Sequence, residues 1–145
     1  GIKLLKSMMD NYPQLNILVQ SADARALIRL RLNIYEHEGG FTVVDKGESL
    51  KQMLAKVDWS LNGVNCTPKE MRTGLELKEE WLSLLELAFN ESLKDKEIAH
   101  RMSIAERTVR HYWTKIQDLL EVYPEEDKNM RIQTESRARE VGLID

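Results

Sequence analysis

The first 61 residues combine two short apolar runs with three longer segments in which apolar residues recur every three or four positions. Short apolar runs predict strands buried on both faces, and the longer spacing predicts amphipathic helices. In chain order these are a helix at 2–11, a strand at 15–19, a helix at 23–36, a strand at 41–44 and a helix at 48–61. Because helices alternate with strands, we expect parallel strands joined by crossover helices.

Turn and capping residues mark the ends of these elements. Tyr12-Pro13 ends the first helix, because proline disfavours helical backbone at the residue before it. Asp23 is a typical N-cap for the second helix, and Gly39-Gly40 closes that helix. The densest cluster of turn-forming residues follows at 62–68, so we assign residues 62–76 to a linker.

The remaining residues, 77–145, are predicted to be helical throughout. Helices are expected at 77–92, 95–102, 105–121 and 131–141, with Gly142 as the C-terminal cap of the last one. The predicted fold class is therefore mainly α. A partial α/β domain of two strands and three helices, 1–61, precedes a four-helix domain, 77–145.

Composition narrows the class of protein. The chain has 145 residues, of which 42% are hydrophobic, and a net charge of −3. It contains no run of the roughly 20 apolar residues that a membrane-spanning helix needs, so we expect a cytoplasmic protein without membrane contact. The single cysteine, Cys66, forms no internal disulfide and no cysteine-based metal site, which agrees with a reducing compartment.

The segment from Lys96 to Ile116 has the spacing of a helix-turn-helix. Two short helices that cross steeply need a small residue at the crossing, and Ala99 has the right position. The motif also requires apolar residues around that alanine, in the turn and on the second helix; here they are Ile98, Met102, Ile104, Val109 and Tyr112. Ser103 occupies the turn position where glycine is most usual, and we expect its hydroxyl to hold the turn.

The predicted second helix of this motif, 105–121, is a candidate recognition helix for the DNA major groove. Arg110 and His111 are the expected base contacts, since arginine grips guanine through two hydrogen bonds and histidine donates or accepts. The side chains expected to contact phosphates are Arg107, Thr108, Thr114 and Lys115. Six basic residues against three acidic ones between Lys94 and Lys115 give a local positive charge in a chain that is acidic as a whole.

Catalytic chemistry has no matching residue pattern. No nucleophile motif or phosphate-binding loop occurs, and the three histidines, His37, His100 and His111, lie too far apart for a ligand spacing. We therefore expect no catalytic residues, no metal, no cofactor and no enzymatic activity.

The C-terminal part resembles the LuxR/FixJ family of regulators, also called NarL-type. The resemblance covers 77–144 and depends on Lys96-Glu97-Ile98-Ala99, Thr108-Val109-Arg110, Ile116, Leu120, Val122 and the run Arg137 to Ile144. It implies four helices, a third helix that reads the major groove, a DNA role for Arg110, and a fourth helix that helps two copies pair. Asp118 and Glu121 depart from the family's usual basic residue and glycine, and residues 123–129 form an insertion.

Residues 1–61 resemble the second half of a response-regulator receiver domain, from its third to its fifth helix. Ser21 then matches the switch hydroxyl at the end of the fourth strand. The conserved lysine of the fifth strand falls on Val44, and Lys46 follows two residues later. No phosphoacceptor aspartate is present, because the strands that would carry it have no counterpart.

Together these patterns predict a sequence-specific DNA-binding transcription regulator of the two-component type. The alternative is a protein-interaction adaptor that uses a helix-turn-helix scaffold without reading DNA. Expected partners are double-stranded DNA and a second copy of the chain, with RNA polymerase as a further candidate. The expected pairing surface includes the apolar residues at the C-terminal end, Ile132, Val141, Leu143 and Ile144.

Overall fold

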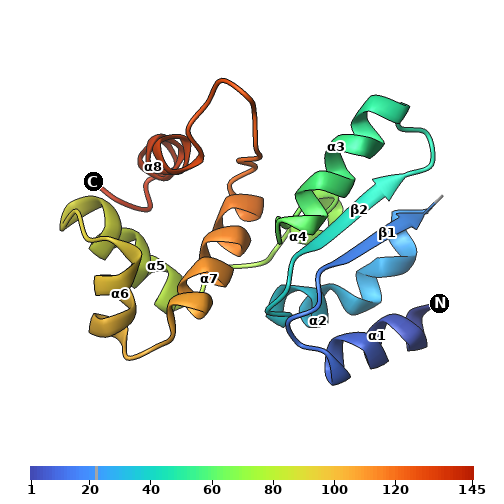
Figure 1. Ribbon diagram of the computed structural model, residues 1–145, viewed down its shortest axis with the longest axis horizontal. Helices are drawn as coiled ribbons and strands as arrows, with labels where there is room; N and C mark the ends of the chain where they lie inside the picture. Colours follow the sequence, from blue (N-terminus) through green and yellow to red (C-terminus); the bar gives the residue numbers. More distant parts are fainter. Residues whose placement is uncertain (22) are drawn as a thin grey trace. The chain divides into compact units, whose positions relative to one another are not determined.

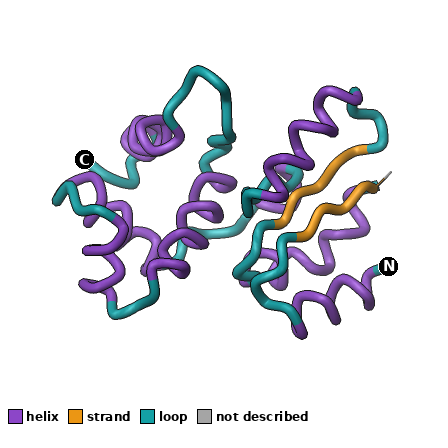
Figure 2. The backbone as a smooth tube through the Cα atoms, in the orientation of Figure 1, coloured by secondary structure: helices purple, strands orange, loops and turns teal. Residues whose placement is uncertain are grey.

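A computed structural model describes residues 1–21 and 23–145 and shows a mainly helical chain (Figures 1 and 2). The chain divides into two compact units, Gly1–Leu75 and Glu76–Asp145. The predicted linker, 62–76, thus ends at the boundary between the units. Each unit has its own buried residues.

The first unit contains a two-stranded parallel sheet between helices. Its elements are α1 (Ile2–Asn11), β1 (Ile17–Ser21), a 3₁₀ helix (Ala24–Leu30), α2 (Arg31–Glu36), β2 (Phe41–Asp45), α3 (Leu50–Leu61) and α4 (Lys69–Arg72). The strands pair in register from Ile17 opposite Phe41 to Ser21 opposite Asp45. Helices α1 and α2 lie on one side of this sheet and α3 on the other (Figure 1). The predicted parallel pairing with helical crossovers is confirmed.

The single helix predicted at 23–36 is wrong in its first half. Asp23 caps the segment as expected, because its Oδ1 accepts a hydrogen bond of 3.0 Å from the backbone N–H of Arg25. The next seven residues form a 3₁₀ helix, and α-helical winding begins only at Arg31. Leu27 and Leu30 are both buried. They are three residues apart, which places them on the same face of a 3₁₀ helix.

Part of the predicted linker belongs to the sheet. Cys66 forms a parallel bridge with Thr42 at the edge of β2 that faces away from β1. The backbone N–H of Cys66 donates to the carbonyl of Phe41, and the N–H of Val43 donates to the carbonyl of Cys66, both at 2.9 Å. Turn-forming composition predicted the bend at 62–65 correctly, but it carries no signal for a single bridging residue directly after the bend.

Two asparagines hold the start of β2 from opposite directions along the chain. The side-chain oxygen of Asn16 accepts the N–H of Gly40 at 2.9 Å, and that of Asn65 accepts the N–H of Phe41 at 3.1 Å. A Cβ atom on Gly40 would lie within 2.8 Å of the backbone of Gly63. Only glycine therefore allows the two chain segments to approach this closely.

The core of the first unit lies on the α1 and α2 side of the sheet. Its buried members are Met9, Ile17, Leu27, Leu30, Ile34, Phe41, Val43 and Met71. His37 is buried beside this core, and its Nε2 lies 2.7 Å from the carbonyl oxygen of Leu15. That contact requires the proton on Nε2, so His37 connects the end of α2 to the start of β1.

The second unit is helical throughout. Its elements are α5 (Glu79–Leu85), a π-helical turn (Glu86–Asn90), α6 (Asp95–Met102), α7 (Glu106–Leu119) and α8 (Met130–Glu140). The predicted bounds of α6 are confirmed, and those of α7 and α8 are correct to within two residues. Gly142 has φ of +83° directly after the C-cap residue Val141, as its predicted capping role requires. The helix predicted at 77–92 instead ends in the π-helical turn.

Candidate nucleic-acid interface

The helices α6 and α7 contact each other, and Ala99 is buried in α6. Ala99 and Ile98 are buried, and the N–H of Ile104 donates to the carbonyl of Ala99 at 3.0 Å. The chain thus turns back onto the alanine itself. Ala99 is buried, as its predicted role at a helix crossing requires, and a larger side chain there would have to displace the residues packed around it.

Ser103 makes the turn possible through its backbone conformation. It lies in the left-handed region, with φ of 56° and ψ of 45°, and its N–H donates to the carbonyl of His100 at 3.2 Å. The turn is therefore closed by main-chain hydrogen bonds, rather than by the serine hydroxyl as the sequence suggested. The position has the geometry that glycine adopts most easily, which explains why glycine is the usual residue there.

The buried face of α7 consists of Val109, Trp113 and Ile116. Arg107 and Arg110 lie on a different face, and both are exposed. They are three residues apart, so their side chains are neighbours on the helix surface. Both guanidinium groups lie in the first two turns of α7. We call Arg107 and Arg110 the arginine pair.

Three other predicted DNA contacts are less exposed than the arginine pair. Thr108 and Thr114 are half-buried, and the Thr114 hydroxyl donates its proton to the carbonyl of His111 at 2.8 Å. That hydrogen is then not available to a phosphate. His111 is half-buried as well.

Lys115 departs most from expectation, because it is buried. It lies four residues after His111 and three before the buried Asp118, so these three side chains share one flank of α7. Arg107, four residues before His111, is next to this flank, but its side chain is exposed. A buried ammonium group makes no contact with a phosphate on the surface, and the predicted positive face accordingly loses one of its six basic residues.

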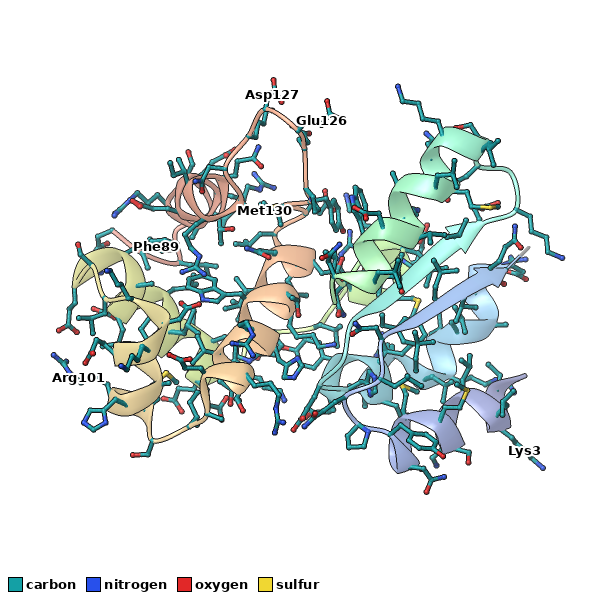
Figure 3. All side chains as sticks on the ribbon, viewed as in Figure 1. Lys3, Phe89, Arg101, Glu126, Asp127 and Met130 are labelled. Carbon is teal, nitrogen blue, oxygen red and sulfur yellow. The ribbon has the colours of Figure 1, made fainter. Side chains whose placement is uncertain are left out.

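Basic side chains on α6 extend the positive region. Lys94, Lys96 and Arg101 are exposed at or on this helix. Arg101 forms an ion pair of 3.4 Å with Glu91, and Figure 3 shows it extending away from the body of the unit. Acidic Glu97 and Glu106 are exposed too.

A side-chain network that the sequence did not predict connects α6, α7 and α8. Asp95 Oδ1 accepts the indole N–H of Trp113 at 3.0 Å and a guanidinium N–H of Arg131 at 3.1 Å. The same guanidinium lies over the Trp113 ring, and the ring of Phe89 packs against Trp113 with 5.5 Å between centroids. Arg131 is 36 residues from Asp95, so no local pattern predicts this contact.

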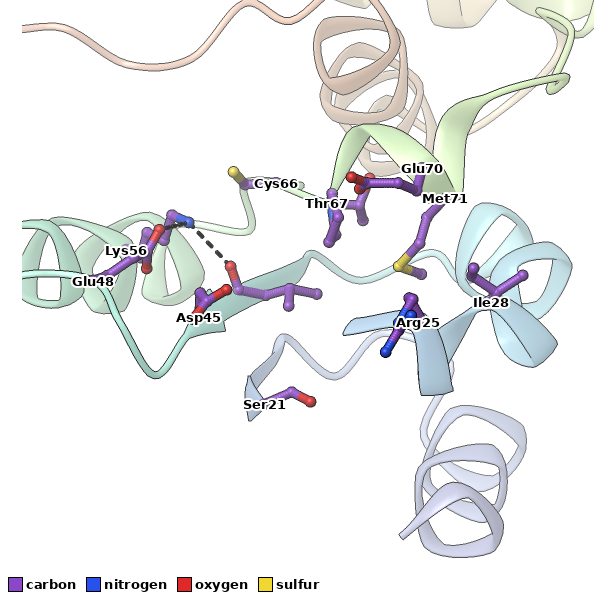
Figure 4. A pocket seen from close by; sticks show the side chains of 12 residues that line it. Ser21, Arg25, Ile28, Asp45, Glu48, Lys56, Cys66, Thr67, Glu70 and Met71 are labelled. Carbon is purple, nitrogen blue, oxygen red and sulfur yellow. Dashed lines mark hydrogen bonds and ion pairs between the residues drawn. The ribbon is translucent and has the colours of Figure 1, made fainter. Parts of the chain in front are cut away.

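In the first unit, Ser21 lies where β1 ends, beside Asp45 at the end of β2. Its hydroxyl oxygen accepts the N–H of Asp23 at 3.2 Å. A pocket of about 350 Å³ opens here, and Figure 4 shows Arg25, Glu48, Lys56 and Met71 among the side chains that line it. The Arg25 guanidinium hydrogen-bonds the Asp23 carboxylate, which lowers the pKa of Asp23.

An ammonium group does reach the end of β2, but it comes from α3. Lys56 Nζ donates to the carbonyl of Val43 at 3.1 Å and pairs with Glu48 (Figure 4). Val44, which aligns with the family's lysine, is buried, and Lys46 is exposed. Its distance in sequence from the strand explains why Lys56 was missed.

None of the helices in the described ranges, 1–21 and 23–145, has the length and apolar character needed to cross a membrane. Comparison of the chain with protein-family models, with curated proteins and with solved structures finds no match.

Proposed function

We propose that the second unit binds double-stranded DNA, with α7 as its recognition helix, and that the chain is a sequence-specific transcription regulator. One observation carries the proposal. A short turn with a left-handed Ser103 joins α6 to α7, and the exposed arginine pair lies in the first half of α7. In helix-turn-helix motifs the first half of the second helix meets the base edges.

The two arginines are proposed to have different roles. Arg110 is the candidate base contact, since a guanidinium fits the O6 and N7 acceptors of guanine with two hydrogen bonds. Arg107 lies one turn earlier and is the candidate phosphate contact. The resemblance to LuxR/FixJ regulators supports the same assignment, because the residue after Thr108-Val109 has a DNA role there.

We propose further that the first unit is of the receiver type. The parallel order of β1 and β2, the crossover helices and the position of Ser21 at the strand end support this. Such a unit would make the chain a regulator of the two-component class.

The charge distribution around α6 and α7 also supports a second candidate function, the protein-interaction adaptor. Lys115 is buried, whereas Glu97 and Glu106 are exposed near the helix-turn-helix. Two carboxylates repel phosphates and fit a protein partner with basic side chains.

Fluorescence anisotropy with labelled duplexes selected from a random pool tests the proposal and separates the two functions. We expect the logarithm of the binding constant to fall linearly with the logarithm of salt concentration, because phosphate contacts release counterions. Arg107→Ala should lower affinity for every duplex and reduce that slope by about one. Arg110→Ala should lower only specific affinity, by about 1–3 kcal/mol.

Arg139→Ala is the matched control, since it removes an equal charge from α8, where Arg139 pairs with Glu135. It should leave the preference between duplexes unchanged. If the chain binds no duplex even at low salt, or if Arg107→Ala and Arg110→Ala bind like the control, DNA binding through α7 is excluded and the adaptor function remains.

A further inference from the structure

Helix α3 carries its large apolar side chains on the outside. Leu50 is 71% exposed, Leu54 60%, Val57 39% and Leu61 76%. A helix that packs on a sheet normally turns such residues inward and its polar residues outward. In α3 these four apolar residues lie outside, whereas Ser60 is buried and Lys56 reaches the backbone of β2.

The spacing of these four residues is specific. They follow one another at intervals of four, three and four positions, so they form one continuous stripe along the helix. We call Leu50, Leu54, Val57 and Leu61 the α3 stripe. Alternating intervals of four and three residues are the spacing of a coiled-coil seam, in which each side chain fits between four of a facing helix. The stripe therefore matches another helix better than it matches a flat surface or a small ligand.

We propose that the α3 stripe binds the same helix of a second copy of this chain, with the two helices antiparallel. In that arrangement Leu54 packs against the partner's Val57, and Leu50 against the partner's Leu61. The two-fold axis then passes between Leu54 and Val57, and every residue of the stripe is covered by a residue of the stripe.

Charge next to the stripe favours the antiparallel direction. Lys51 and Asp58 are exposed, and each directly follows an inner position of the heptad, Leu50 or Val57. Antiparallel helices bring such flanking positions of the two copies together, so Lys51 faces the partner's Asp58 at both ends of the seam. A parallel pair would instead place Asp58 opposite the partner's Met53, with no opposite charge.

The expected affinity is modest. Helix α3 has 12 residues, so it is about 18 Å long, and a two-helix contact of that length lies at or below the lower limit of about 1,200 Å² for stable interfaces. A reversible dimer in the micromolar range follows. The C-terminal helix is a weaker candidate: Ile144 is buried, and Ile132 and Val141 are nine residues apart, which puts them on opposite sides of α8.

Sedimentation equilibrium of the full chain without DNA tests the proposal independently of the proposed function. We expect a concentration-dependent dimer. Leu54→Gln should raise its dissociation constant by about tenfold or more, because two buried leucines are lost per dimer. Leu4→Gln on α1, where Leu4 is 63% exposed, and Ile132→Gln on α8 should leave it unchanged. Circular dichroism of each variant verifies that the helices remain.

Charge exchange tests the direction of the helices. Lys51→Asp alone and Asp58→Lys alone should each weaken the dimer, because like charges then meet at both ends. A mixture of the two variants should associate as a heterodimer, since opposite charges meet again. A wild-type chain that is monomeric at every concentration, an unchanged Leu54→Gln dimer, or a mixture that associates no better than its components would each overturn the proposal.

Discussion

The guanidinium of Arg131 lies 3.9 Å from the centroid of the Trp113 ring while its N–H groups bond both carboxylate oxygens of Asp95. Arg131 lies in the first turn of α8, Trp113 in the middle of α7, and Asp95 is the first residue of α6. Three side chains thus connect three helices of the second unit. Asp95 also lies in the first turn of α6, where a negative charge stabilises the helix dipole.

Loss of this stacked ion pair should destabilise the second unit. We expect Arg131→Gln to lower the free energy of unfolding by about 1–2 kcal/mol, since a cation over an aromatic face contributes about 0.5–2 kcal/mol and a partly exposed ion pair up to about 1. Arg139→Gln removes an ordinary surface pair with Glu135 and should cost less than about 0.5 kcal/mol. Urea denaturation measures both. Equal effects would mean that the stacking contributes nothing.

Replacing Ser103 by glycine should stabilise the helix-turn-helix. A left-handed conformation costs a residue with a Cβ atom about 1–2 kcal/mol, and glycine avoids this cost. Glycine loses more backbone entropy on folding, which offsets part of the gain. We expect Ser103→Gly to raise the melting temperature of the second unit and Ser103→Val to lower it. Thermal melts followed by circular dichroism give both values. A lower melting temperature for the glycine variant would show that the serine side chain contributes to the turn.

Two glycines of the first unit should respond differently to the same substitution. Gly40→Ala places a Cβ against the backbone of Gly63, which cannot move without disturbing β2, so we expect a loss of about 1–3 kcal/mol. Gly47→Ala places a Cβ 3.4 Å from the Asp45 carboxylate, an ordinary contact. Its unfolding free energy should change by less than about 0.5 kcal/mol. Similar losses for both variants would contradict the close approach at Gly40.

The chain should not take up phosphate from acetyl phosphate or carbamoyl phosphate. Within the described ranges no three acidic, histidine or cysteine side chains gather as a metal site would require. Asp23 pairs with Arg25, and Asp45 accepts the N–H of Gly47 at 2.8 Å. Intact-protein mass spectrometry of the full chain is the measurement. A stable acyl phosphate on Asp10, Asp23 or Asp45 would refute the alignment with the second half of a receiver.

Local periodicity predicted the elements whose burial repeats regularly. The alternation of apolar runs and helical segments was enough for β2 and its parallel partner, and the spacing around Ala99 was enough for α6 and the turn after it. The 3₁₀ helix was missed because Leu27 and Leu30 fit an α-helical pattern as well as a 3₁₀ one. The burial of both leucines in the core fits either winding.

Side-chain chemistry of the candidate site was harder to predict, because it depends on contacts between distant segments. A helical wheel places Arg107 and Arg110 correctly on an exposed face, but it gives Lys115 no reason to be buried. Lys56 lies 13 residues from the β2 carbonyl that it contacts. Arg131 lies 36 residues from Asp95, its partner in the network around Trp113. Sequence spacing describes one helix at a time and contains no information on such pairs.

The two asparagines at the start of β2 bear on how the first unit folds. Asn16 and Asn65 each lie 24 residues from the backbone N–H group that they accept, one before β2 and one after it. The entropy lost on closing a loop depends on its length, so both closures carry nearly the same penalty. Loop length alone therefore favours neither contact over the other during folding. The start of β2 is the point at which the segments before and after it meet. We expect backbone amides at Gly40 and Phe41 to gain protection from hydrogen exchange in the same kinetic phase.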